Sequence, residues 1–155
     1  MSGIDPSVFM HDIPTYPHVK PVCQRIHPAH PRKASTIKGE VEKLLKAGFI
    51  YMIPLTDWVS NIVPVTKKQG TIHICIDYLD LNCAYPKDNY PTPFIDQIID
   101  ECDGSEFFSF MDGFSGYNHI NITLTDQDKT TFICLWVTFA YKKLPFGRKN
   151  VGATF

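Results

Sequence analysis

The residues best suited to chemistry begin at an aspartate that follows a hydrophobic segment. The aromatic-rich stretch 107–111 predicts a strand that runs directly into Asp112. A carboxylate at a strand end is sparsely shielded, and carboxylate oxygen is the ligand that a hard cation such as Mg²⁺ prefers. The small residues Gly113, Ser115 and Gly116 would let backbone amides approach a phosphate, and the ring of Tyr117 could wall a sugar pocket. A plainer alternative stays open, because an aspartate at this position commonly just forms a turn.

Acidic residues are concentrated around this aspartate, and basic residues flank them. Eleven of the sixteen acidic residues lie between Asp77 and Asp128, together with a single base, Lys87. An acidic centre between basic segments suits metal-assisted chemistry on phosphates. It equally suits ordinary solvated helices, so charge alone decides nothing.

Length and composition limit the classes of protein that fit. The chain has 155 residues, enough for one domain or a piece of a larger one, and 44% hydrophobic residues argue against global disorder. A formal net charge of −1 argues against a generic basic nucleic-acid binder. No apolar run reaches the roughly 18 residues of a membrane helix, and no secretion signal is visible. Five cysteines without C-x-x-C spacing indicate reduced thiols, so we expect an intracellular protein, cytoplasmic or nuclear, without a membrane partner.

The first part of the chain predicts an arm, a helix and a hairpin. Residues 1–34 are rich in proline and histidine and predict an extended lead-in arm, in which the irregular histidine spacing argues against a metal site. Apolar residues at i, i+4, i+7 and i+8 predict a packing helix over 35–47. Residues 60–66 and 71–78 predict two strands joined by a basic turn, with Pro64 at an edge position.

The second part predicts a further helix and several strands. An apolar stripe indicates a helix over 93–103. Strands are expected at 107–111 and 120–124, and a long buried strand at 131–139. This order of elements predicts an α+β fold with a mostly antiparallel sheet and packing helices.

Four stretches, in this order, resemble the reverse transcriptase of gypsy-type long-terminal-repeat retrotransposons and, more distantly, of retroviruses. They are GEVEKLLKAGFI, DWVSNIVPVTKKQGTIHICIDYLDLN, DNYPTPFIDQIIDECDGSEFFSFMDGFSGYNHI and TDQDKTTFICLWVTFAYKKLPFGRKNVGATF. The resemblance extends from about His11 to Phe155. It implies an RNA-directed DNA polymerase that transfers nucleotides with two Mg²⁺ (or Mn²⁺) ions, and whose partners are an RNA template, a DNA primer and a deoxynucleoside triphosphate.

The same resemblance implies roles for individual residues. Asp112 matches the catalytic aspartate that binds both metal ions, and Gly113 matches the residue whose backbone carbonyl is a further ligand. Ser115 and Gly116 match positions whose amides contact the incoming triphosphate. Tyr117 matches the aromatic gate that excludes ribonucleotides.

Further implied nucleotide-binding positions lie before and after this motif. Lys67 or Lys68 matches the fingers lysine that holds phosphate, and the hairpin length leaves the choice open. Phe146 and Gly147 belong to the Pro-Phe-Gly motif beside the nucleotide pocket. His73 occupies the position of a phosphate-binding arginine.

Several departures from the family pattern weaken the expected contacts with phosphate. The family's Trp-Arg after the hairpin is Ile72-His73 here, and a histidine near pH 7 is mostly neutral. A second arginine is replaced by Leu79, a third frequent one by Phe114, and the proline near the end of the family motif by Gly152.

A Tyr-x-Asp-Asp hairpin, which carries the family's second metal-binding element, is not found before Phe155. We therefore expect residues 35–155 to form the fingers and an incomplete palm, without the thumb and ribonuclease H domains, and to be inactive as this chain alone. Such a fragment should leave a sheet edge unpaired and apolar surface exposed. The alternative is a non-catalytic, decayed retroelement remnant with at most weak nucleic-acid binding.

Overall fold

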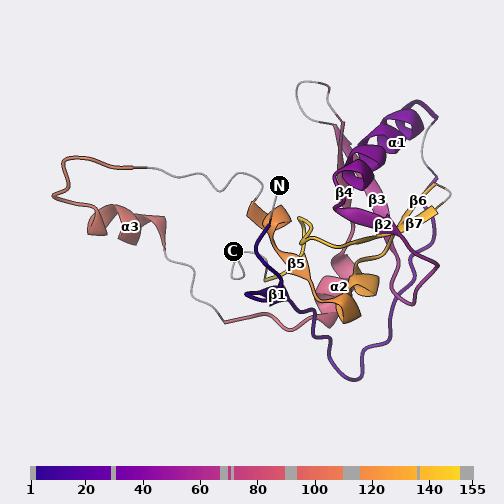
Figure 1. The fold of residues 1–155 in the computed structure, drawn as a ribbon, viewed down its shortest axis with the longest axis horizontal. Coiled ribbons are helices and arrows are strands. Elements are labelled where there is room, and N and C mark those ends of the chain that lie inside the picture. The colour runs from indigo at the N-terminus through magenta and orange to yellow at the C-terminus, as the bar shows by residue number, and fades with distance from the viewer. Residues whose placement is uncertain are drawn as a thin grey trace.

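A five-stranded sheet organises the molecule. The structure is a computed structural model that describes residues 3–28, 31–66, 70, 72–89, 94–109, 116–135 and 137–150. The sheet has the order β2-β7-β6-β3-β4, and its strands are β2 (Ile50–Met52), β3 (Ser60–Thr66), β4 (Ile72–Ile76), β6 (Phe132–Cys134) and β7 (Val137–Tyr141). Three of its four neighbouring pairs are antiparallel, and β3 runs parallel to β6. Together with the helices of the chain (Figure 1), this sheet confirms the predicted α+β fold.

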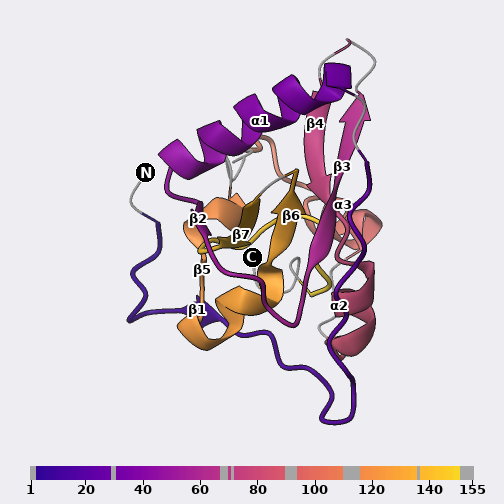
Figure 2. The ribbon, with the colours of Figure 1, turned by 90° about the vertical axis from the view of Figure 1, so that its right-hand side faces the viewer.

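Helices and short 3₁₀ turns connect the strands, and the helix at residues 95–101 stands away from the sheet (Figure 1). They are α1 (Pro31–Lys46), α2 (Leu79–Ala84), α3 (Ile95–Glu101), η1 (Gly116–His119) and η2 (Leu124–Thr130). The longest of them, α1, crosses the sheet diagonally (Figure 2) and buries Ile37 and Val41. It begins four residues earlier than predicted, because a proline is favoured in the first turn of a helix.

The predicted hairpin is confirmed, with one refinement at its proline. β3 and β4 pair antiparallel with Pro64 opposite Ile74. β3 lies inside the sheet, but its pairing with β6 ends at Asn61. At Pro64 only β4 is alongside, so the missing N–H of the proline leaves no ladder bond unmade.

The extents predicted for three strands were wrong. Residues 131–139 form two strands, β6 and β7, which reverse direction where Leu135 takes a φ of 48°. The strand predicted over 120–124 is only β5 (Asn121–Ile122), since Leu124 already belongs to η2. Residues 107–109 form no strand, and 110–111 lie outside the described residues.

The N-terminal arm packs along the body of the protein. Its strand β1 (Met10–His11) pairs parallel to β5, and a single bridge joins Cys23 to Val59. Ile13 is fully buried. The carboxylate of Asp126 accepts a hydrogen bond from the Ile13 N–H at 2.6 Å and another from Lys129 at 2.8 Å. Lys129 also donates to the Ile13 carbonyl, so one ion pair binds both the N–H and the carbonyl of Ile13.

The main core lies between α1, the sheet and α2. Phe132 on β6 is fully buried and stacks on Phe139 with 5.8 Å between ring centroids. Tyr78, which precedes α2, is also buried and donates a hydrogen bond to the Thr130 carbonyl. Among the described residues, no helix combines the length and apolar character needed to cross a membrane.

Removing the Asp126 carboxylate should release the arm. In Asp126→Ala the Ile13 N–H and the Lys129 ammonium both lose a partly buried partner, which costs about 1–3 kcal/mol of unfolding free energy. Urea unfolding measures this loss, and limited proteolysis should cut the arm faster. The matched control is Asp128→Ala, because that side chain is exposed. Equal stability of the two variants would contradict the role assigned to Asp126.

Candidate nucleotide site

Two aromatic side chains from distant parts of the sequence meet at the surface. Tyr117 in η1 and Phe146, which follows Pro145, pack edge to face with ring centroids 4.8 Å apart and planes at 88°. Phe146 remains 65% exposed, so its ring is open to a ligand. The structure thus brings together Tyr117 and Phe146, two residues that the family resemblance placed beside one nucleotide.

A small apolar cluster supports this aromatic pair. Ile120 and Leu144 are buried and pack against Tyr117. The Leu144 N–H donates to the Ile120 carbonyl at 3.0 Å, which fixes the two segments to each other. Gly116 at the start of η1 is buried as well.

The turn after Phe146 is held by α2. Gly147 has a φ of 87°, a left-handed conformation that glycine adopts without strain. Its carbonyl accepts a hydrogen bond from the Asn82 side-chain amide at 2.9 Å. The amide oxygen of Asn82 in turn accepts from the Lys149 N–H at 2.9 Å, and the Lys149 ammonium donates to the Tyr85 carbonyl. A single asparagine therefore sets the path of the chain on both sides of Arg148.

Arg148 is buried between two tyrosine rings. Its guanidinium carbon lies 5.8 Å from the Tyr78 ring centroid and 5.7 Å from that of Tyr85, and only 6% of the residue is exposed. None of its three guanidinium nitrogens has a hydrogen-bond acceptor among the described residues. Burial lowers the pKa of this guanidinium, against the opposing effects of the two tyrosines and Asp126. Cation–π contact is the main compensation for its desolvation.

His11 in the arm belongs to the same buried layer. Its ring centroid lies 6.4 Å from that of Tyr85, and 4% of the residue is exposed. Burial, and next the positive charge of Arg148, lower its pKa to about 4, although Asp12 and Asp126 act in the opposite direction. The histidine is consequently neutral at pH 7.

Other predicted site residues lie apart from the pair or outside the described part of the chain. His73 is exposed on β4, opposite Val65, and no hydrogen bond, ion pair or ring contact joins it to Tyr117 or Phe146 within the described residues. Lys67, Lys68, Asp112, Gly113 and Ser115 lie outside the described residues. Among the residues that are described, no group of three acidic, histidine or cysteine side chains could hold a metal ion.

Sequence reasoning missed the residues that hold the turn. Asn82, Tyr78 and Tyr85 carry this role together with Arg148. A signal existed for two of them, because Tyr78 and Asn82 belong to the segment Asp-Tyr-Leu-Asp-Leu-Asn that resembles a family motif. Nothing in the local pattern marked Arg148 as buried.

The sequence is similar to parts of retrotransposon polyproteins. No protein-family model matches it. The transposon Tf2-3 and Tf2-7 polyproteins of Schizosaccharomyces pombe are each 33% identical over 132 residues, which make up 84% of this chain. Those residues are 10% of each polyprotein, so the chain spans about a tenth of the relatives it matches.

The fold is that of solved viral reverse transcriptases. A crystal structure of prototype foamy virus protease–reverse transcriptase matches with a TM-score of 0.74 and 20% identity, over 94% of this chain and 19% of that one. The foamy viral enzyme in complex with double-stranded DNA matches with a TM-score of 0.69 and 22% identity, over 94% of this chain and 25% of that one. Its complex with an RNA/DNA hybrid matches with a TM-score of 0.70 and 20% identity, over 88% and 18%.

Replacing Arg148 by methionine should not destabilise the fold. Arg148→Met keeps an unbranched apolar side chain between the two tyrosine rings and removes a buried charge without hydrogen-bond acceptors among the described residues. We expect the unfolding free energy to be unchanged or to rise by about 1–2 kcal/mol in urea titrations. Arg148→Ala is the comparison, because it removes charge and packing together and should destabilise. A loss above about 1 kcal/mol in Arg148→Met would show that the charge itself stabilises the fold.

Acid should weaken the protein through His11. Its pKa is about 4 when folded and about 6.5 when unfolded, so the unfolded state binds more protons between these values. The contribution of neutral His11 to the unfolding free energy is therefore fully present above about pH 6.5. It is lost as the pH drops toward 4, by up to about 3 kcal/mol. Thermal melting of His11→Gln should show a shallower loss over this range. His18→Gln is the control, because His18 is exposed, and an unchanged slope in His11→Gln would exclude this histidine as the cause.

Proposed function

Because the chain is related to a segment of retrotransposon polyproteins and has the fold of reverse transcriptases, we propose that it forms the fingers and part of the palm of an RNA-directed DNA polymerase. One observation supports this most: Tyr117 and Phe146, from separate motifs, form a single aromatic surface. The exposed face of Phe146 and the fixed turn at Gly147 suit a nucleotide that binds against this surface.

In this proposal the aromatic pair contacts the sugar side of the incoming deoxynucleotide. Tyr117 would exclude ribonucleotides, because an added 2′-hydroxyl would collide with its ring. The amides of Ser115 and Gly116 would contact the triphosphate. Lys67 or Lys68 would bind phosphate from the hairpin, where His73 offers less charge than the arginine usual in the family.

Asp112 and the backbone carbonyl of Gly113 are the proposed ligands of Mg²⁺ or Mn²⁺. A divalent ion at this position would neutralise charge on the triphosphate and lower the pKa of a primer hydroxyl. Two ions need more oxygen ligands than these two residues supply. We therefore expect the chain alone to bind divalent ions weakly, with Asp112→Asn abolishing the binding that remains.

The proposed partners are an RNA template paired with a DNA primer. A second function, that of a non-catalytic remnant, is favoured by one observation. Leu79 at the start of α2 is 66% exposed at a position where the family carries an arginine, so a phosphate contact is missing from the surface. The two functions differ in whether the chain still binds a hybrid duplex.

Hybrid binding at low salt tests the proposal. Fluorescence anisotropy with a labelled RNA–DNA template–primer should show binding that weakens with salt. The double variant Lys67→Ala/Lys68→Ala should flatten the salt slope by about one to two units, because each phosphate contact contributes about 0.9. Lys38→Ala is the matched control, since Lys38 lies on the exposed face of α1 beside Glu42. Absence of binding at low salt would leave the remnant function.

Primer extension addresses the chemistry separately. We expect no incorporation by the purified chain with Mg²⁺, because its proposed metal ligands are too few. Incorporation that disappears in Asp112→Asn would contradict this expectation and identify the chain as an active polymerase.

A further inference from the structure

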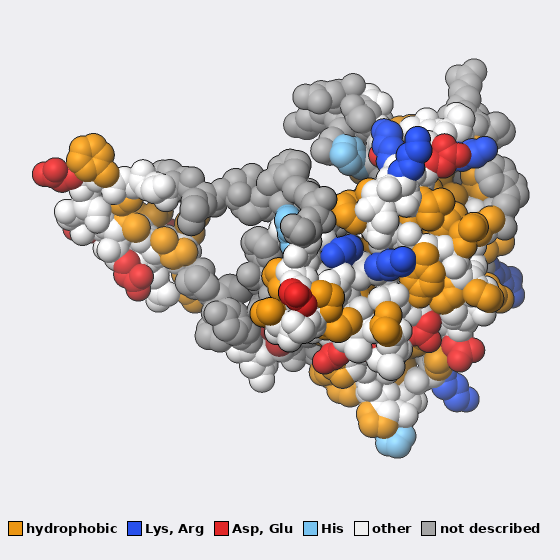
Figure 3. All heavy atoms as spheres, in the orientation of Figure 1, with side chains coloured by type: hydrophobic (Ala, Val, Ile, Leu, Met, Phe, Trp, Pro, Cys, Tyr) orange, Lys and Arg blue, Asp and Glu red, His pale blue; other side chains and the backbone are white. Residues whose placement is uncertain are grey.

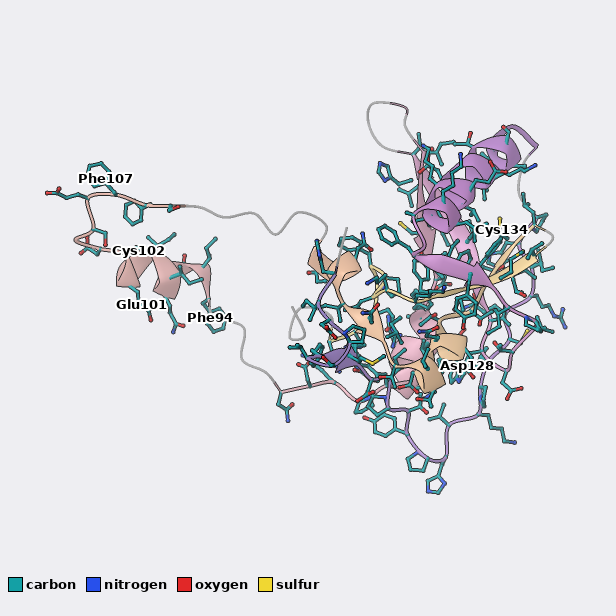
Figure 4. All side chains as sticks on the ribbon, viewed as in Figure 1. Phe94, Glu101, Cys102, Phe107, Asp128 and Cys134 are labelled. Atoms are coloured by element: carbon teal, nitrogen blue, oxygen red, sulfur yellow. The ribbon has the colours of Figure 1, made fainter. Side chains whose placement is uncertain are left out.

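The α3 segment, residues 94–109, presents apolar side chains to solvent. α3 has no buried residue, and the exposed fractions reach 71% for Ile95, 62% for Ile99 and 90% for Phe107. Figure 1 shows α3 standing away from the sheet, and in Figure 4 Phe94 and Phe107 lie at opposite ends of this segment. The sequence predicted this helix and its apolar stripe, and the structure leaves the stripe exposed within the described residues.

A hollow runs along this segment and could receive a partner. It has a volume of about 970 Å³ and lies between α3 and the residues that follow it, with Ile95, Ile98, Ile99 and Phe108 among its lining. Apolar surface of this kind gains roughly 25 cal/mol for each Å² that a partner covers. Contiguous exposed apolar surface is typical of an interaction site.

The charge of the α3 segment defines what can cover it. Residues 94–109 contain five acidic side chains and no basic one. Asp100 and Asp103 border the hollow itself. Nucleic acid and a second α3 segment are both repelled, because each would bring negative charge against negative charge. The occupant must combine apolar surface with lysine or arginine.

The remainder of the same chain meets this requirement. It holds fifteen basic and eleven acidic residues, hence a formal charge of +4. Its edge strand β2 carries Met52, which is 65% exposed, and the ammonium of Lys142 lies 5.4 Å from the Tyr51 ring centroid. Lys142 is exposed and has no carboxylate partner within the described part of the chain. In Figure 3 basic and hydrophobic side chains lie together on the body, whereas the α3 segment shows acidic and hydrophobic ones.

Because α3 stands away from the body of its own copy (Figure 1), we propose that the α3 segment docks on the body of a second copy of this chain. Each copy offers both an acidic α3 segment and a basic body. A two-fold arrangement therefore lets both α3 segments dock at once and closes the assembly as a dimer. The inference stands apart from the proposed polymerase function, since it depends only on the charge and exposure of the chain.

Sedimentation equilibrium of the full chain tests this dimer. We expect a concentration-dependent dimer, and Ile95→Asp/Ile99→Asp should raise its dissociation constant about tenfold or more. Leu124→Asp is the matched control, because Leu124 is 78% exposed but lies in η2, and its dissociation constant should stay unchanged. A wild-type chain that stays monomeric at about 100 micromolar, where a dimer of micromolar dissociation constant would be almost fully formed, or a double variant that dimerises as well as wild type, overturns the proposal.

Carbodiimide cross-linking locates the contact without any substitution. An equal mixture of ¹⁴N- and ¹⁵N-labelled chains distinguishes cross-links between copies from those within one copy. Mixed-label peptides that join Asp100 or Asp103 to a lysine of the body support the proposal. Cross-links confined to one copy, or a dimer whose cross-links omit the α3 segment, overturn it. This measurement also decides the matter if the double variant fails to fold.

Discussion

The hydrogen bonds of Asn82 are the constraint on which the candidate site depends. This amide fixes the Gly147 carbonyl on one side and the Lys149 N–H on the other, so it determines where the chain turns after Phe146. Phe146 is mostly exposed and gains little from burial. Its position against Tyr117 therefore follows from the turn beneath it and from the small cluster of Ile120 and Leu144. The exposed aromatic pair is thus held in place by the buried side chains of Ile120 and Leu144 and by the hydrogen bonds of Asn82.

The same turn carries a charge into the interior. Arg148 lies between Tyr78 and Tyr85, and each tyrosine hydroxyl donates to a different part of the protein, the Thr130 carbonyl and the Asp12 carbonyl respectively. Rings held at both ends form a fixed pocket for the guanidinium. Burial is the main reason that the pKa of the neighbouring His11 falls to about 4, and the positive charge of Arg148 lowers it further, so this histidine stays neutral. The buried charge of Arg148 thus helps to keep His11 in its neutral form.

Local patterns predicted some elements well and failed where the outcome depended on distant contacts. The hairpin of β3 and β4 was predictable because Ile72, Ile74 and Ile76 alternate with polar neighbours and a basic glycine turn precedes them. The reversal between β6 and β7 was not, because Leu135 lies within an apolar run and carries no turn signal. The pairing of Tyr117 with Phe146 could be expected only from the family resemblance. Burial of Arg148 could not be expected at all, since it requires two tyrosines that lie far away in the sequence.

The net charge of −1 conceals an uneven division that matters for assembly. The α3 segment holds five negative charges beside exposed isoleucine and phenylalanine side chains, while the rest of the chain is positive. Periodicity identifies which face of a helix is apolar, but it says nothing about what the face contacts. Burial of the apolar face favours association, and the acidic side chains of the α3 segment select partner surfaces that carry positive charge. Under the proposed function, the same positive charges outside the α3 segment would attract both nucleic acid and the α3 segment. Because nucleic acid and the α3 segment would compete for the same basic side chains, salt and nucleic acid should both oppose docking of the α3 segment.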